Sequence, residues 1–224
     1  MDCDFCDELR RPDNSRFAEI YASYTTNRVV ARFGNLVAMP TIGQLFPGSL
    51  LIIPITHIET MSSLREDEMS QLSSFINDLE AAISHEGPVI AFEHGARCET
   101  GGGCGIYHAH LHLVPVPNHI SVTDLLPIGI DSEPFNSAIS IVDGLCTLRY
   151  SSEYLIVRDS QKNVRFIESL TSFGKQYPSQ YFRRRLTELF NLHCSWDWRT
   201  YQEPEQYVFE TINMFKDTNV SLCK

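Results

Sequence analysis

Three histidines at a spacing of two residues are the part of this sequence best suited to chemistry. His108, His110 and His112 alternate with apolar residues over the stretch 107–114. In a β-strand this spacing places the three imidazoles on one face, about 7 Å apart, and the apolar side chains on the other. Imidazole is neutral near pH 7, so it can attack phosphorus without first losing a proton. We predict a strand with one chemical face, against the alternative of a plain polar face.

The residues before this strand are rich in glycine. Residues 100–105 contain four glycines, and their bare backbone N–H groups suit a loop that closes on an anion such as phosphate. We predict that the N–H groups of Gly103, Cys104 and Gly105 stabilise charge on phosphate oxygens. Arg97 is the nearby cation that could assist them.

A pair of cysteines opens the chain at a spacing that suits a metal. Cys3 and Cys6 could place two thiolates on one tetrahedral zinc ion, or form a redox pair, although the thioredoxin-type context is missing. The zinc interpretation needs two more ligands, for which His57 and His108 are candidates. Four protein ligands would leave no open position, which is typical of a structural zinc.

Composition limits the classes of protein and partner. The chain has 224 residues, of which 43% are hydrophobic, and a formal net charge of −10. It can bury a sizeable core, and its charge gives no global attraction to nucleic acid. No apolar run approaches the roughly 20 residues of a membrane span. The first residues lack the pattern of a signal peptide, and the cysteine count is the odd number seven, so we expect a cytoplasmic protein with thiols rather than disulfides.

The first half alternates strand and helix patterns. We predict a hairpin over 28–38, a strand over 49–53 that ends at Pro54, and a strand over 88–92. Between them, apolar residues at steps of three and four predict a helix that begins with a capping box of Ser63 and Glu66 and ends near Gly87.

This order, combined with the histidines, resembles the histidine-triad (HIT) superfamily. Its signature is His-x-His-x-His followed by apolar residues, here Leu113 and Val114. The resemblance implies an α+β fold over residues 1–118, an antiparallel sheet backed by helices. In zinc-binding members a strand ends in Ile-Pro and a ligand histidine follows three residues later, which fits Pro54 and His57.

The resemblance also implies the roles of the remaining histidines. The middle one, His110, would form a covalent nucleotidyl intermediate, and His112 would hydrogen-bond a phosphate oxygen or the leaving group. Thr41 stands where many members have an aspartate that holds ribose hydroxyls. The usual Asn-x-Gly is replaced by residues 93–95, where Glu93 or His94 has either a second catalytic role or a structural hydrogen bond.

Beyond residue 118 the pattern changes. We predict strands over 138–142, 145–150 and 154–157 and helices over 178–192 and 204–216, which together form an α+β extension over 119–224 packed on the HIT-like domain. The basic cluster 183–185 is either a solvated helix face or the source of one arginine for the site. Trp196 and Trp198 either pack in the core or stack on a base.

The expected function is hydrolysis of a nucleoside phosphate derivative, such as a dinucleoside polyphosphate, nucleotide sugar or phosphoramidate, at the α-phosphorus. A nucleotidyltransferase or phosphorylase that passes the nucleotidyl group to phosphate or a sugar phosphate is the alternative. A non-catalytic zinc module that binds nucleotides is a third hypothesis. We expect a small nucleotide as the partner, with neither nucleic acid nor membrane, and either a homodimer or a monomer that completes the site within one chain.

Overall fold

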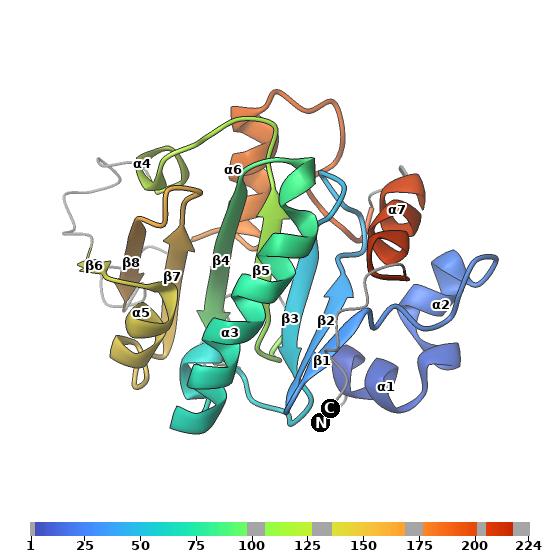
Figure 1. The fold of residues 1–224 in the computed structure, drawn as a ribbon, viewed down its shortest axis with the longest axis horizontal. Helices are drawn as coiled ribbons and strands as arrows, with labels where there is room; N and C mark the ends of the chain where they lie inside the picture. The colour runs from blue at the N-terminus through green and yellow to red at the C-terminus, as the bar shows by residue number, and fades with distance from the viewer. Residues whose placement is uncertain (1–2, 98–105, 127–135, 169–176, 201–204, 217–224) are drawn as a thin grey trace.

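A continuous antiparallel sheet organises the molecule. The computed structural model describes residues 3–97, 106–126, 136–168, 177–200 and 205–216. Within these ranges the sheet has eight strands in the order β1-β2-β3-β5-β4-β7-β8-β6 (Figure 1). The strands are β1 (Ala31–Phe33), β2 (Leu36–Pro40), β3 (Leu50–Pro54), β4 (Val89–Ala96), β5 (Leu111–Pro115), β6 (Asn136–Ala138), β7 (Glu153–Arg158) and β8 (Val164–Glu168). Because β7 pairs with β4, the second half of the chain extends the sheet of the first.

Helices cover both faces of this sheet. They are α1 (Asp4–Arg10), α2 (Arg16–Tyr21), α3 (Glu66–Ile83), α4 (Val122–Leu125), α5 (Ile141–Thr147), α6 (Tyr181–Leu189) and α7 (Glu205–Lys216). Helices α3 and α5 share one apolar core with the sheet, and α4 and α6 share a second core on the opposite face. Figure 1 accordingly shows α3 in front of the sheet and α6 behind it. The α+β class and antiparallel sheet predicted from the sequence are confirmed.

Side-chain alternation along β4 separates the two cores. Phe92 packs against Phe182 of α6, with ring centroids 4.7 Å apart, so His94 two residues later points to the same face. Glu93 points to the α3 face, where Tyr154 donates a hydrogen bond to it. A Cβ atom on Gly95 would lie 2.3 Å from the Tyr154 ring. Glycine at this position therefore allows Tyr154 to cross β4 and reach Glu93.

The elements predicted for the first half are present with shifted boundaries, since β4 continues to Ala96 and α3 ends at Ile83. The hairpin turns at Gly34, whose φ of +58° suits glycine, and β3, α3 and β4 occupy the predicted stretches. The predicted capping box is wrong, because Ser63 ends the short 3-10 turn Met61–Ser63. Helix α3 begins at Glu66, and the backbone N–H of Arg65 donates to the Glu68 carboxylate at 2.9 Å.

The strand predicted for the histidines is shorter than expected. It begins at Leu111, and His108 lies in a bend before it. The Ala109 N–H donates to the Ile58 carbonyl at 2.7 Å, so this segment is bonded to the loop after β3 instead of continuing the ladder. The prediction that all three histidines share one strand face is therefore wrong.

Two of the three strands predicted after residue 118 are also wrong. Residues 141–147 form α5, because the Ser140 hydroxyl caps the helix by accepting from the Asp143 N–H at 3.1 Å. The expected turn at Gly144 lies inside that helix. The third strand is confirmed as β7, β8 was not predicted, and α6 and α7 match the predicted helices, with α6 shorter than expected.

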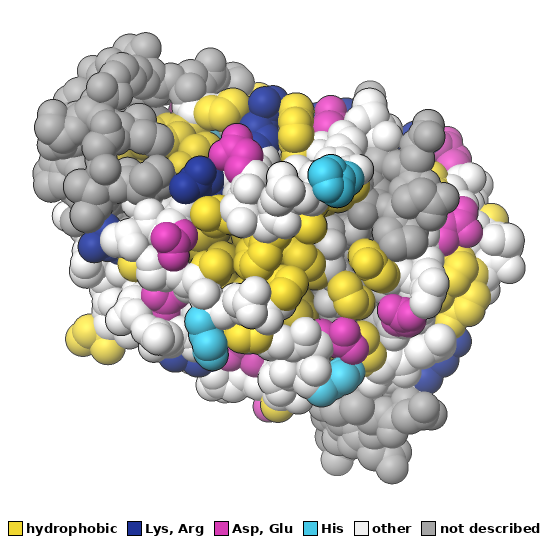
Figure 2. Space-filling view, turned by 90° about the horizontal axis from the view of Figure 1, so that it is seen from above, with side chains coloured by type: hydrophobic (Ala, Val, Ile, Leu, Met, Phe, Trp, Pro, Cys, Tyr) yellow, Lys and Arg dark blue, Asp and Glu magenta, His cyan; other side chains and the backbone are white. Residues whose placement is uncertain are grey.

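One end of the molecule has an apolar surface patch. Figure 2 looks onto the end at the top of Figure 1, where hydrophobic side chains fill the centre of the face and charged ones surround it. The core beneath α6 also includes half-buried residues, among them Leu189, Phe190 and Leu192. In the part of the chain that the structure describes, no helix combines the length and apolar character needed to cross a bilayer.

Candidate functional site

Four side chains from distant segments form a cluster that could hold a metal ion. They are the predicted ligands Cys3, Cys6, His57 and His108, whose ligand atoms all lie within 4.8 Å of one another. The Nδ1 atom of His108 lies 3.3 Å from the Cys3 sulfur and 3.5 Å from the Cys6 sulfur. A tetrahedral zinc, about 2.3 Å from sulfur and about 2.0 Å from nitrogen, would hold such atoms roughly 3.5 Å apart. The donor set and its spacing fit zinc.

The state of His108 suits a ligand. Its Nε2–H donates to the carbonyl of Pro54 at 2.8 Å, which leaves Nδ1 toward the two sulfurs. Burial lowers the pKa of His108 to about 4, so the ring is neutral at pH 7, as a metal ligand must be. Burial also raises the pKa of the Cys6 thiol to about 11, with the Cys3 thiol adding to the shift. A bound cation would supply the positive charge that stabilises the thiolates.

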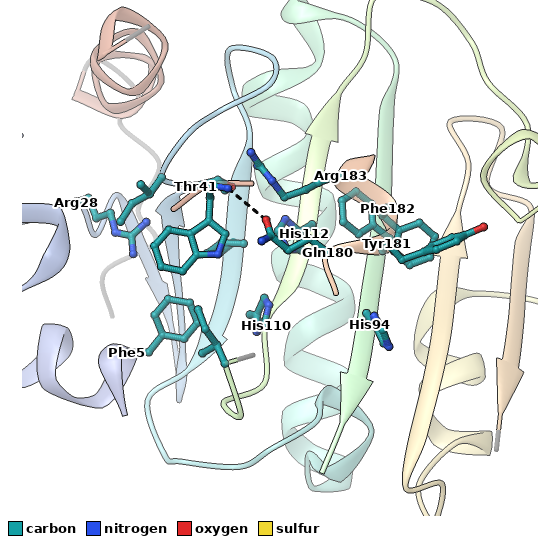
Figure 3. Close-up of a pocket in the computed structure, with 15 residues that line it drawn as sticks. Phe5, Arg28, Thr41, His94, His110, His112, Gln180, Tyr181, Phe182 and Arg183 are labelled. Atoms are coloured by element: carbon teal, nitrogen blue, oxygen red, sulfur yellow. Dashed lines mark hydrogen bonds between the residues drawn. The ribbon is translucent and has the colours of Figure 1, made fainter. Parts of the chain in front are cut away.

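A pocket lies beside this cluster. Figure 3 shows its walls, which come from both halves of the chain. It is lined by Phe5, Arg28, Thr41, Ile42, Leu51, Phe92, His94, Ile106, His110, His112, Gln180, Tyr181, Phe182, Arg183 and Trp198.

His110 and His112 line the pocket in different states. The Nδ1–H of His110 donates to the backbone carbonyl of His108 at 2.7 Å, so the lone pair of the ring is on Nε2. His112 stacks on Phe92 with ring centroids 4.6 Å apart. Burial, assisted by the charges of His110 and Arg183, lowers the pKa of His112 well below its usual value. His112 is therefore a neutral imidazole at pH 7.

One arginine of the cluster 183–185 reaches the pocket. Arg183 is buried, and its guanidinium donates to the carbonyls of Gly43 and Trp196, each at 2.7 Å. The other two point elsewhere: Arg184 lies over the Trp196 ring, and Arg185 donates to the Asp124 carbonyl. The two tryptophans are separated as well, since only Trp198 of the pair lines the pocket.

Other predicted site residues have varied positions. Thr41 lines the pocket, and its buried hydroxyl has no hydrogen-bond partner among the described residues. Arg97 is not part of the pocket lining and donates to the carbonyl of Arg149 at 3.4 Å. Gly103, Cys104 and Gly105 lie outside the described residues.

The contacts of Glu93 are those of a buried carboxylate that joins neighbouring segments of the fold. It is buried on the face away from the pocket, and it accepts hydrogen bonds from the Tyr154 hydroxyl and, at 2.9 Å, from the Met61 N–H. Burial raises the pKa of Glu93 to about 7, although these hydrogen bonds oppose the shift. Of its two predicted roles, the contacts favour the structural one.

Sequence reasoning missed several pocket residues. Gln180 and Tyr181 come from the start of α6, and Phe5 comes from α1. Only Phe5 has a signal in the sequence, since it lies between the two cysteines of the metal cluster. The others belong to no motif, and their position follows from the packing of α6 on the sheet.

Comparisons with known proteins find matches that cover about half of the chain. Residues 21–127 match the family model described as "Protein similar to CwfJ C-terminal". The chain is 24% identical over 105 residues to "Protein HitA" of Neisseria gonorrhoeae, covering 47% of this chain and 98% of that protein. It is 24% identical over 113 residues to an uncharacterized HIT-like protein of Saccharolobus solfataricus, covering 50% of this chain and 73% of the relative.

Solved structures with similar folds include further proteins of this kind. A hypothetical histidine triad nucleotide-binding protein from Sulfolobus tokodaii has a TM-score of 0.39 and 20% identity, over 51% of this chain and 68% of that one. A HIT family hydrolase from Legionella pneumophila has a TM-score of 0.35 and 25% identity, over 54% of this chain and 96% of that one. By sequence, the first half of this chain is therefore similar to proteins of the HIT superfamily.

Proposed function

We propose that this protein is a nucleotide hydrolase that cleaves a nucleoside phosphate derivative at the α-phosphorus through a nucleotidyl-histidine intermediate on His110. The observation that carries the proposal is the hydrogen bond from His110 Nδ1 to the carbonyl of His108. It fixes the tautomer in which Nε2 is the nucleophilic nitrogen, on a ring that lines the pocket.

The reaction has two displacements at phosphorus. His110 Nε2 forms a bond to the α-phosphorus while the bond to the leaving group breaks. Water then attacks the same phosphorus, the P–N bond breaks, and the nucleoside monophosphate is released. Neutral His112, beside His110 at a ring distance of 5.4 Å, donates a hydrogen bond to a phosphate oxygen. Contacts from the N–H groups of Gly103, Cys104 and Gly105 remain a prediction.

The pocket walls suit a nucleoside. Phe5, Ile42 and Trp198 offer apolar and aromatic surface for a base, while Thr41 and Gln180 offer polar groups for a sugar. The Thr41 hydroxyl is buried without a partner among the described residues, so a ribose hydroxyl could satisfy it. Arg183 contributes positive charge near His112.

The metal cluster would bind one structural zinc through Cys3, Cys6, His57 and His108. Zinc would join α1 to the segment that carries His110. This matters for the site because Phe5, which lies between the two cysteines, contacts the His110 ring at a centroid distance of 5.6 Å.

A substrate panel tests the proposal. Dinucleoside polyphosphates, nucleotide sugars and nucleoside phosphoramidates are incubated with the protein, with the His110→Ala variant, and with His119→Ala as control. His119 is exposed and hydrogen-bonded to Ser160, away from the pocket lining. We expect a nucleoside monophosphate from one class, its loss by at least about 10³-fold in His110→Ala, and no change in the control. Retained turnover in His110→Ala would refute the proposal.

The same panel separates the transferase alternative. Added phosphate or sugar phosphate would become part of the product if the nucleotidyl group passes to either acceptor. A nucleoside monophosphate whose one new phosphoryl oxygen comes from water supports hydrolysis.

A further inference from the structure

A histidine paired with a carboxylate reaches the pocket from the junction of the two halves. His94 on β4 lies with its Nε2 atom 3.0 Å from Oε1 of Glu153, which begins β7. Both side chains are almost fully buried, at 4% and 0% exposure. Figure 3 shows His94 on the opposite side of His110 from Phe5.

The sheet places His94 next to the reacting histidines. Phe92 pairs with His112 across β4 and β5, and His94 is the next residue of β4 on the same face. His94 and His110 both line the pocket. His94 is therefore positioned to contact a group attached to the phosphorus that His110 attacks.

The two ring nitrogens of His94 differ, because one is hydrogen-bonded and the other has no partner among the described residues. Its Nε2–H donates to the Glu153 carboxylate, which fixes the orientation of the ring. Its Nδ1 atom is buried and has no hydrogen-bond partner among the described residues. A histidine that lines a pocket, is oriented by a carboxylate and keeps its second nitrogen unpaired has the features of a general acid–base residue.

His112 is poorly suited to the same task. Burial lowers the pKa of His112 well below its usual value, so the ring is a neutral imidazole at pH 7, and the N–H of a neutral imidazole is a weak acid. It can donate a hydrogen bond to phosphate, but a leaving group that departs as a strong base needs a true proton donor.

We propose that His94, held by Glu153, is the general acid–base residue that serves the leaving group and then the water. The inference rests on the proposed function. In the first displacement, protonated His94 gives its Nδ1 proton to the leaving atom as that atom's bond to phosphorus breaks. In the second, neutral Nδ1 takes a proton from the attacking water while the P–N bond to His110 breaks. The pair thereby returns to its starting state.

This role defines a substrate class. A leaving group that departs as an amine or an alkoxide must be protonated, whereas a nitrophenolate leaves readily as an anion. His94 therefore favours nucleoside phosphoramidates and alkyl esters, whose leaving groups cannot depart without a proton.

Leaving-group dependence tests the proposal. The kcat/KM of His94→Gln is measured on two substrates that carry the nucleoside selected by the panel, an alkyl phosphoramidate and a p-nitrophenyl ester. We expect a loss of about 10² to 10⁴-fold on the phosphoramidate and of less than about tenfold on the nitrophenyl ester. Because both values come from one preparation, their ratio does not depend on the folded fraction.

Two further variants sharpen the result. Glu153→Gln keeps a carbonyl for the His94 N–H but removes the negative charge, so it should shift the same ratio in the same direction by a smaller factor. His85→Gln is the matched control, because His85 is an exposed histidine 3.2 Å from Glu86 and outside the pocket lining. Its ratio should equal that of the wild type.

The outcomes distinguish this inference from the proposed function. Equal losses on both substrates in His94→Gln, with the nucleotidyl adduct on His110 still formed from the nitrophenyl ester, would overturn the role of His94 alone. Absence of the adduct in the wild-type protein with either substrate would overturn the proposed function, and the inference with it.

Discussion

At the scale of single residues, hydrogen bonds to backbone carbonyls give neighbouring histidines different chemistry. His108 donates through Nε2 to Pro54 and turns Nδ1 toward the sulfurs, whereas His110 donates through Nδ1 to His108 and keeps its lone pair on Nε2. The sequence predicts the imidazoles and their spacing. It does not predict which nitrogen of each ring donates a hydrogen bond. The carbonyl acceptors are placed by the bend at His108, and the alternating sequence pattern gives no sign of that bend.

Glu93 provides a residue-scale prediction about pH. Its pKa is raised from 4.5 to about 7 in the folded protein by burial, so the folded state holds a proton that the unfolded state has released. The resulting stabilisation is complete below pH 4.5 and is lost as the pH rises through 7. Relative to Glu93→Gln, the wild-type free energy of unfolding should fall by up to about 1.4 kcal/mol per pH unit in this interval.

Urea unfolding of both proteins from pH 4.5 to above 7 measures this difference. The two profiles should diverge within the interval and run parallel above it. Parallel profiles throughout would show that Glu93 is ionised in the folded protein at the low end of the range.

At the scale of elements, local sequence patterns predicted helices and strands well where the apolar periodicity extends over many residues. They predicted short elements poorly. The 18-residue helix α3 and the hairpin at Gly34 were predicted from local pattern. Residues 138–142 and 145–150 were predicted as strands, but the cap from Ser140 begins a helix at Ile141. The pair of His94 and Glu153 spans 59 residues and depends on β7 joining β4, which no local pattern indicates.

Helix α1 provides an element-scale prediction about metal. Cys6→Ser removes a ligand, so the bound zinc should fall from about one per chain to near zero, and Tm should drop by roughly 10 °C. Cys146→Ser is the control, because Cys146 is an exposed free thiol outside the cluster. Metal analysis and thermal unfolding of the two variants give the result. An unchanged zinc content in Cys6→Ser would exclude this ligand set.

At the scale of the whole molecule, the second half of the chain completes both the sheet and the pocket. Strand β7 occupies the edge of β4 over the positions from Ala91 to Ala96, and α6 supplies Gln180, Tyr181, Phe182 and Arg183 to the pocket. Residues 1–118 alone would leave that edge of β4 unpaired, and an unpaired edge strand can hydrogen-bond to a strand of another chain. The division into domains 1–118 and 119–224 stays a prediction, since the sheet runs through both.

The occupied edge predicts a monomer. Because β4 is paired within the chain and both halves line the pocket in the described residues, we expect one chain to complete the site. Sedimentation should give a mass near 25.5 kDa. A stable dimer at micromolar concentration would mean that another surface, such as the apolar face in Figure 2, joins two copies.

The central claim is that His110 carries the nucleotidyl group during turnover, and the mass of the peptide that contains His110 tests it most directly. The protein is mixed with substrate, quenched with base to preserve phosphoramidate bonds, digested and analysed by mass spectrometry. We predict that the wild-type peptide containing His110 is heavier by one nucleotidyl group, and that the corresponding peptide of His110→Ala is unmodified. Turnover without any nucleotidyl adduct, or an adduct on His112 instead, would contradict the assignment of His110 as the nucleophile.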